Sequence, residues 1–137
     1  MSATGLRAVR YFKEIDGVTK IIANDLDSKA VDLIKINAKK NGDEDNIIHV
    51  TQEDCIALLY SKKSFYNVVD LDPYGTAIPM IDSSLWGIKN EGLMMATFTD
   101  MQVLCGNYID TCYYKYGSIP YKTPYCHEMA KRIALYS

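Results

Sequence analysis

Short apolar runs alternate with amphipathic stretches along this chain. Four runs rich in apolar and β-branched residues predict buried strands, at 18–23, 47–51, 67–71 and 93–99. Residues 28–41 predict an amphipathic helix, because lysines separate apolar side chains that recur at helical spacing: Val31, Ile34 and Ala38. Strands that alternate with helices in this way predict an α/β domain with a mostly parallel sheet.

The opening loop is expected to lead into another helix. Thr4 is a candidate N-cap for it, and an inner face at i, i+4, i+7 spacing follows, made by Ala8, Phe12 and Ile15. Further helices are predicted at 56–60, 80–88 and 126–136. In a doubly wound domain such a loop follows the central first strand, so we expect this chain to begin just after that strand.

Composition describes one soluble globular domain, since 48% of the 137 residues are apolar and 23% are charged. The net charge of −2 gives no overall footprint of a nucleic-acid binder and leaves local patches open. We find no leader pattern and no apolar stretch of bilayer length. These features predict an intracellular protein with no membrane partner.

Cysteine usage argues against a disulfide framework. The four cysteines are scattered and form no Cys-x-x-Cys pair, which favours reduced thiols. A zinc site built from Cys105, Cys112, Cys126 and His127 is a weak alternative, because these spacings match no familiar zinc pattern. We therefore expect no metal.

Polar residues at the end of the run 67–71 are the strongest candidates for chemistry. Asp72, Pro73, Tyr74 and Gly75 follow it directly, and open α/β sheets bind ligands at the carboxyl ends of their strands. Proline fixes φ and removes a donor, so the strand must end there. An Asp-Pro-aromatic turn in this position resembles the motif of amino-methyltransferases, which methylate exocyclic or amide nitrogens with S-adenosylmethionine. The alternative is an ordinary strand-to-loop turn.

Carboxylates also follow the first two strand runs. Asp25 or Asp27 can accept hydrogen bonds from the ribose hydroxyls of a nucleoside, and one of the two is expected to cap the next helix. Asp54 can hold an adenine amino group, or it can cap the helix at 56–60. No Gly-x-Gly-x-x-Gly turn follows a strand, which weakens a dinucleotide-binding alternative.

Six blocks of sequence, in order, are similar to the family of tRNA guanine-N2 dimethyltransferases that modify position 26 of tRNA. They are SATGLRAVR at 2–10, ANDLD at 23–27, DLDPYGT at 70–76, TDMQVLCG at 99–106, KYG at 115–117 and CHEMA at 126–130. The resemblance implies a Rossmann-like class I methyltransferase fold, S-adenosylmethionine as donor, tRNA as partner, and N2,N2-dimethylguanosine as product. It also implies that residues 1–137 are a partial catalytic domain truncated at both ends, without the first strand, the last strands and the C-terminal domain.

The resemblance implies a role for each site residue. The cofactor would contact six of them: Gly5 and Arg7 near its methionine portion, Asp25 on the ribose, Leu26 and Cys55 against adenine, and Asp54 on the adenine amino group. For Arg7 the alternative is an ion pair with a carboxylate of the core.

In the implied reaction, Asp72 accepts an N–H of the guanine N2 amine and the carbonyl of Pro73 is a second acceptor. Tyr74 would stack on the flipped-out base. Asp70 is interpreted as structural, because the period of a strand puts it on the side of Asp72 but deeper in the sheet.

Other readings stay open: an amino-methyltransferase acting on rRNA, DNA or a protein amide, or a non-catalytic nucleotide-binding module. Without a central first strand, the runs 18–23 and 67–71 would present unpaired edges. These edges would be filled by a partner chain, closed by direct pairing, or left as a widened cleft. We expect self-association and weak cofactor binding from the chain alone, and a location in the nucleus or mitochondrion of a eukaryote, otherwise the cytoplasm.

Overall fold

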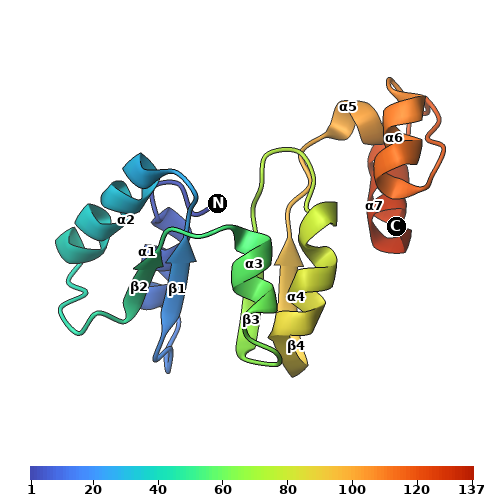
Figure 1. Ribbon diagram of the computed structural model, residues 1–137. Coiled ribbons are helices and arrows are strands. Elements are labelled where there is room, and N and C mark those ends of the chain that lie inside the picture. The colour runs from blue at the N-terminus through green and yellow to red at the C-terminus, as the bar shows by residue number, and fades with distance from the viewer.

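A computed structural model describes all 137 residues and has the expected alternation of strands and helices (Figure 1). The elements in chain order are α1 Leu6–Glu14, β1 Ile21–Asn24, α2 Ser28–Lys40, β2 Ile48–Thr51, α3 Cys55–Tyr60, β3 Tyr66–Leu71, the 3-10 helix η1 Ile78–Met80, α4 Ile81–Gly87, β4 Ile88–Ala96, α5 Met101–Leu104, α6 Ile109–Tyr116 and α7 Cys126–Tyr136. None of these helices is long and apolar enough to cross a membrane.

The four strands form two separate parallel pairs. β1 pairs with β2, with Ile21 opposite Ile48, and β3 pairs with β4, with Leu71 opposite Ala96. Since β1 and β3 are not hydrogen-bonded to each other, each keeps one free edge. Of the three outcomes considered for these edges, the structure rules out direct pairing of β1 with β3. All strands point the same way, so their carboxyl ends meet on one side of the molecule (Figure 1).

Three small cores hold these elements together. The first joins α1 and α2 to β1 and β2, the second lies among α5, α6 and α7, and the third joins α3 to β3. The side chains predicted for the inner face of α2 are buried as expected: Val31, Ile34 and Ala38. Figure 1 shows α5, α6 and α7 gathered in a lobe beyond the carboxyl end of β4. Phe98 packs against the second and third cores and so fixes this lobe to the β3–β4 unit.

The start of α1 differs from the sequence prediction. Gly5, not Thr4, is the N-cap; its φ is +76°, and no side chain caps the helix. A Cβ on Gly5 would lie 3.0 Å from Cγ2 of Ile34, so both conformation and space require glycine here. Ile15 is 51% exposed because α1 ends at Glu14.

Two strands begin elsewhere than expected. β1 begins at Ile21, because residues 18–20 have no partner in β2. β4 begins at Ile88 and contains a bulge, since Ile88 lies opposite Tyr66 while Leu93 lies opposite Val68. A Cβ on Gly92, within the bulge, would lie 2.9 Å from the carbonyl oxygen of Asn67, so the two backbones approach closely there.

Candidate functional site

A cleft of about 510 Å³ opens at the carboxyl ends of β1, β2 and β3. This volume is typical of small-molecule sites, which range from roughly 300 to 1,000 Å³. Seven of the nine residues predicted for the site line it: Asp25, Leu26, Asp54, Cys55, Asp72, Pro73 and Tyr74. The parallel arrangement explains this, because it brings the loops after three strands to one edge.

Asp25 is the most strongly held carboxylate of the cleft. Its Oδ2 accepts from the amide of Ala3 (2.9 Å) and pairs with the amino group of Met1 (2.8 Å), while Oδ1 accepts from the amide of Asp27 (3.1 Å). Burial alone would raise the pKa of Asp25, but the Met1 amino group and the two amides outweigh burial and lower the pKa to about 2. Because a carboxylate has about four acceptor sites, capacity is left for a ligand.

Asp27 caps α2, so only one of the two neighbouring carboxylates faces the cleft. The side chain of Asp27 accepts from the amide of Lys29 at 3.0 Å. This division of roles between Asp25 and Asp27 agrees with the expectation that one of them is a helix cap.

Asp54 is both a helix cap and a wall of the cleft. Its Oδ1 accepts from the amide of Ala57 at 2.9 Å, which caps α3, and its Oδ2 makes no hydrogen bond within the chain. The two roles weighed for Asp54 are therefore compatible. Leu26 also lines the cleft and is 67% exposed to solvent, and burial raises the pKa of the Cys55 thiol.

Gly5 and Arg7 lie outside the cleft. Gly5 is not among the lining residues, and its α-carbon faces Ile34. Arg7 is engaged by two carboxylates: Nη1 lies 2.8 Å from Oδ1 of Asp70, and Nη2 lies 3.3 Å from Oδ2 of Asp72. The alternative weighed for Arg7, pairing with a carboxylate, is thus what the structure contains.

Asp70 is a structural anchor, as expected from its depth in the strand. Besides Arg7, it accepts a hydrogen bond from the hydroxyl of Tyr11 at 2.5 Å. Since Arg7 and Tyr11 belong to α1 and Asp70 to β3, these contacts join the two strand pairs. They hold together the two halves that form the cleft.

The loop after β3 presents its functional groups outward. Tyr74 is fully exposed, and the side chain of Asp72 is 42% exposed, with Oδ1 free of partners. Gly75 closes the turn with a φ of +83°, a left-handed conformation that glycine adopts without strain. The loop therefore combines a carboxylate and an unoccupied aromatic ring at the mouth of the cleft.

Several lining residues were not predicted from the sequence, among them Asn24, Glu53, Met80 and Thr99. Thr99 follows β4, so the strand-end argument that selected Asp72 would also have selected it. Asn24 closes the ends of β1 and β2, because its side chain bonds both the amide and the carbonyl of Glu53. No sequence signal pointed to Met80.

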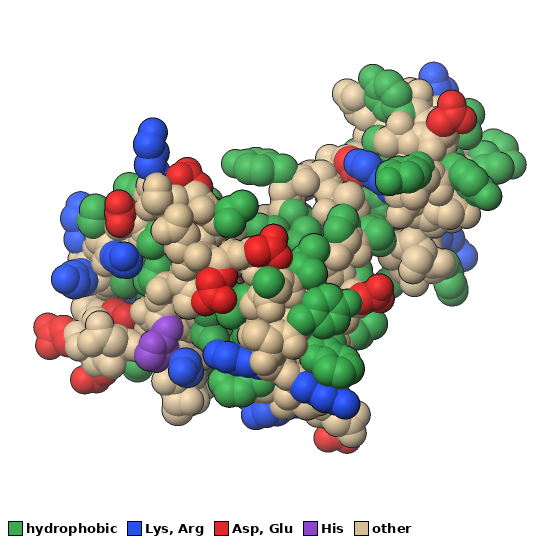
Figure 2. All heavy atoms as spheres, viewed as in Figure 1, with side chains coloured by type: hydrophobic (Ala, Val, Ile, Leu, Met, Phe, Trp, Pro, Cys, Tyr) green, Lys and Arg blue, Asp and Glu red, His purple; other side chains and the backbone are tan.

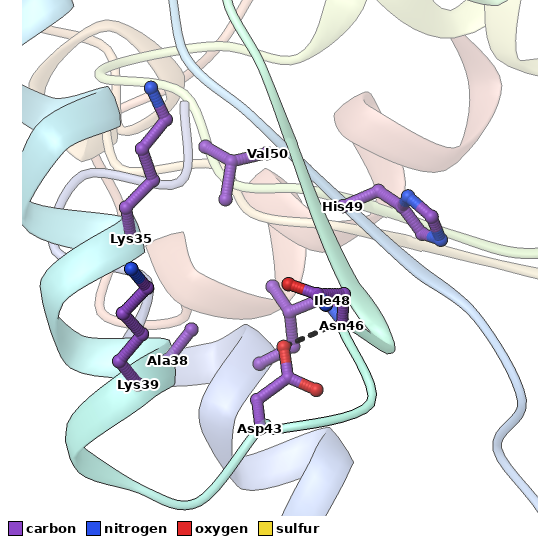
Figure 3. Close-up of a pocket in the computed structure, with 8 residues that line it drawn as sticks. All are labelled: Lys35, Ala38, Lys39, Asp43, Asn46, Ile48, His49 and Val50. Atoms are coloured by element: carbon purple, nitrogen blue, oxygen red, sulfur yellow. Dashed lines mark hydrogen bonds between the residues drawn. The ribbon is translucent and has the colours of Figure 1, made fainter.

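A second hollow, of about 340 Å³, lies between α2 and β2 (Figure 3). Lys35 and Lys39 reach it from α2, whereas His49 points to the other side of β2. The carboxylate of Asp43 is used locally, since it accepts from the amides of Ile47 (2.7 Å) and Ile48 (3.0 Å). This hollow contains none of the predicted site residues.

The structure gathers no three His, Cys, Asp or Glu side chains into a group that could hold a metal ion. The residues weighed for a zinc site, Cys105, Cys112, Cys126 and His127, form no such group in the structure. Cys112 is buried in the core of the α5–α7 lobe, while the thiols of Cys105 and Cys126 lie within hydrogen-bonding reach of each other, and burial together with this contact raises the pKa of Cys105.

Comparison with known proteins shows the family of this chain. The family model described as "TRM: N2,N2-dimethylguanosine tRNA methyltransferase" matches residues 1–137. The chain belongs to this family. The human tRNA (guanine(26)-N(2))-dimethyltransferase is 40% identical over 100% of this chain and 21% of its own length. Its counterpart in Methanothermobacter thermautotrophicus is 42% identical over 96% of the chain and 34% of its own length.

A solved structure of Trm1 from Pyrococcus horikoshii with S-adenosyl-L-methionine superposes with a TM-score of 0.88 at 28% identity. The match covers 98% of this chain and 40% of that one. This likeness and the parallel strands confirm the predicted Rossmann-like methyltransferase fold. The chain spans between about a fifth and two fifths of the length of these TRM-family relatives.

Proposed function

We propose that the protein that carries this chain transfers methyl groups from S-adenosylmethionine to the exocyclic N2 of guanine 26 in tRNA, giving N2,N2-dimethylguanosine. The observation that carries the proposal is the cleft, which Asp72, Pro73 and Tyr74 line together with Asp25 and Asp54. Family membership and the names of the relatives support the same reaction. The solved relative in complex with S-adenosyl-L-methionine supports the choice of donor.

The residues of the cleft fit this cofactor chemically. Asp25 would accept from the ribose hydroxyls with the lone pairs that its three partners leave free. The free Oδ2 of Asp54 would accept from the adenine amino group, and Leu26 and Cys55 would contact the adenine ring. When bound, S-adenosylmethionine supplies an electrophilic sulfonium methyl group.

Gly5 and Arg7 support the site from outside in this proposal. Gly5 allows the opening loop to pack against α2, which brings Ala3 to Asp25. Arg7 pairs with Oδ2 of Asp72 and so leaves Oδ1 as the available acceptor.

Asp72 and Pro73 would act on the nucleophile. The lone pair of a guanine N2 amine is delocalised into the ring, so the amine attacks poorly unless an acceptor pulls on an N–H and orients the nitrogen. Oδ1 of Asp72 is free for this purpose, and the backbone carbonyl of Pro73 makes no hydrogen bond within the chain. The acceptor pair would hold the amine in line with the methyl group, and orientation of this kind can supply roughly 7–11 kcal/mol.

Tyr74 would receive the target base. A guanine N2 inside a helix cannot reach a cleft, so the base must leave its stack. The ring of Tyr74 is fully exposed and makes no hydrogen bond, which leaves both of its faces for stacking. Since tRNA is an intracellular substrate, the proposal implies action in the nucleus or mitochondrion of a eukaryote, or in the cytoplasm of a prokaryote.

One assay tests the proposal against its alternatives. The intact protein is incubated with S-adenosylmethionine and bulk tRNA, rRNA or DNA, and the digested nucleosides are analysed by mass spectrometry. We expect N2,N2-dimethylguanosine in tRNA alone, and thermal stabilisation by S-adenosylhomocysteine but not by NAD. Methylation of rRNA or DNA only, or stabilisation by NAD only, would contradict it.

A further inference from the structure

A reciprocal pair of hydrogen bonds joins Gly75, after β3, to Thr99, after β4. The amide of Gly75 donates to Oγ1 of Thr99 at 2.9 Å, and the amide of Thr99 donates to the carbonyl of Gly75 at 2.8 Å. Between Leu71 and Gly75 the loop has one other tie to the chain, the ion pair of Asp72 with Arg7. The Thr99–Gly75 contact therefore fixes the far end of the loop that carries Asp72, Pro73 and Tyr74.

The conformation of Gly75 explains why the contact with Thr99 controls the orientation of the loop that carries Asp72, Pro73 and Tyr74. Its φ of +83° reverses the chain directly after Tyr74, and no atom lies within 4 Å of the position of a Cβ. Glycine is thus required for its left-handed conformation and not for space. Because such a turn is intrinsically flexible, an external contact must select one orientation of the preceding residues, and Thr99 makes that contact.

Thr99 is itself held from both sides along the chain. Phe98, before it, is packed in two hydrophobic cores. Asp100, after it, accepts hydrogen bonds from the hydroxyl of Tyr116 (2.6 Å) and from Nζ of Lys115 (3.0 Å). Tyr116 is 3% exposed, and burial and the contact with Asp100 raise the pKa of its hydroxyl, which remains a donor.

We propose that Thr99 is a positioning residue: its hydroxyl, anchored through Asp100 and Tyr116 to the α5–α7 lobe, sets the orientation of the Asp72–Tyr74 loop over the cleft. This inference rests on the proposed function, since it concerns how the acceptor loop is held for methyl transfer. The lobe thereby contributes to the site, because its contacts with Asp100 fix the position of Thr99, and Thr99 in turn fixes the position of the loop. A displacement of about 1 Å in a reacting group can cost about 100-fold in rate, so loss of this contact is expected to affect turnover.

The test compares two substitutions of Thr99 in the intact protein. Thr99→Val keeps the shape and removes the hydroxyl, whereas Thr99→Ser keeps the hydroxyl. We expect Thr99→Val to lower kcat for tRNA methylation by about 10- to 100-fold, with KM for S-adenosylmethionine and the thermal midpoint nearly unchanged. Thr99→Ser should restore kcat to within a few-fold of wild type. Thr111→Val, at an exposed position of α6 without hydrogen bonds, is the matched control and should behave as wild type.

A second measurement does not depend on activity. The Gly75 amide should exchange with solvent faster in Thr99→Val than in wild type and Thr99→Ser, because it has lost its acceptor. If Thr99→Val does not fold, Tyr116→Phe replaces it as the test, since it keeps the ring and removes the bond to Asp100; a fall in kcat is again expected. Wild-type kcat in the variant, or equal loss in Thr99→Val and Thr99→Ser, would overturn the inference. Absence of tRNA methylation by wild type would instead overturn the proposed function.

Discussion

Arg7 in α1 and Asp70 in β3 form an ion pair of 2.8 Å between residues that are 63 positions apart in the sequence. No backbone hydrogen bonds join β1 to β3, so side chains must hold the two strand pairs together. Arg7 also reaches Asp72, and Tyr11 shares Asp70. The relationship therefore connects the integrity of the fold to the geometry of the acceptor carboxylate.

Replacing Arg7 should loosen the junction of the two halves. We expect Arg7→Met to lower the free energy of unfolding by about 1.5–3 kcal/mol, the range for a hydrogen bond to a charged group. The control is Arg10→Met on the same helix, whose exposed pair with Glu14 should contribute less than about 1 kcal/mol. Urea unfolding followed by circular dichroism measures both, and equal effects would show that Arg7 is not a junction residue.

Substitutions of Asp25 and of its neighbour Asp27 should have different effects, because Asp25 is proposed to bind the cofactor whereas Asp27 caps α2. Asp25→Ala should weaken S-adenosylhomocysteine binding by about 1–3 kcal/mol, because a charged acceptor is lost. Asp27→Ala removes the cap of α2 and should lower stability by about 1 kcal/mol with little change in affinity. Isothermal titration calorimetry with the intact protein measures the affinities; unchanged affinity in Asp25→Ala would move the ribose contact to another residue.

The contribution of Asp25 to the free energy of unfolding should depend on pH in the acid range. In the folded chain of residues 1–137, whose Met1 amino group pairs with Asp25, the pKa of Asp25 falls from an ordinary 3.8 to about 2, so its contribution to stability is present above pH 3.8 and is lost as pH falls through 2. The difference in unfolding free energy between wild type and Asp25→Asn should therefore shrink by on the order of 2 kcal/mol between pH 5 and pH 2. A difference that stays constant over this interval would show that the carboxylate is not held as described.

The free edges of β1 and β3 lead to a prediction about self-association of the chain. An unpaired strand edge is a template for another strand, so we expect residues 1–137 alone to self-associate at high concentration. Val68→Lys, on β3, should increase the monomer fraction measured by light scattering, because a charged side chain disfavours edge pairing. Ile119→Lys introduces the same charge on the exposed surface of the lobe and should have no such effect. A monomer at every concentration would refute this prediction.

The α5–α7 lobe carries most of the exposed tyrosines of the chain. Figure 2 shows apolar side chains projecting over this lobe. Six tyrosines of the lobe are each more than half exposed: Tyr108, Tyr113, Tyr114, Tyr121, Tyr125 and Tyr136. Tyr116, by contrast, is buried and bonds Asp100. The sequence pattern did not distinguish the one tyrosine that anchors the lobe from those that face solvent.

Much of the architecture was predictable because it depends on local patterns. Strand runs ending in Asp25 and Asp72 implied that these carboxylates share one edge, and the parallel pairing brings them to one cleft. The capping roles of Asp27 and Asp54 followed from their position before helices. Arg7 could be assigned only as one of two alternatives, because its partners lie more than 60 positions away. Pairing at that distance depends on how α1 packs beside β3, which local sequence does not encode.

Other features were missed for similar reasons. The resemblance placed Gly5 near the methionine portion of the cofactor, and its packing against Ile34 was not foreseen. Thr99 could have been selected as a strand-end residue, but its hydrogen bond to Gly75 could not be foreseen, because that bond requires the loops after β3 and β4 to lie side by side. In both residues the function is set by a neighbour distant in sequence.

Methyl transfer by an Asp72→Ala variant of the intact protein tests the central claim most directly. Removal of the acceptor should abolish formation of N2,N2-dimethylguanosine in tRNA under single-turnover conditions, while affinity for S-adenosylhomocysteine stays close to that of wild type. Asp82→Ala, which removes an exposed carboxylate from the first turn of α4, is the matched control and should methylate at the wild-type rate. Wild-type turnover by Asp72→Ala would contradict the account, because Asp72 would then not be the acceptor that activates the guanine amine.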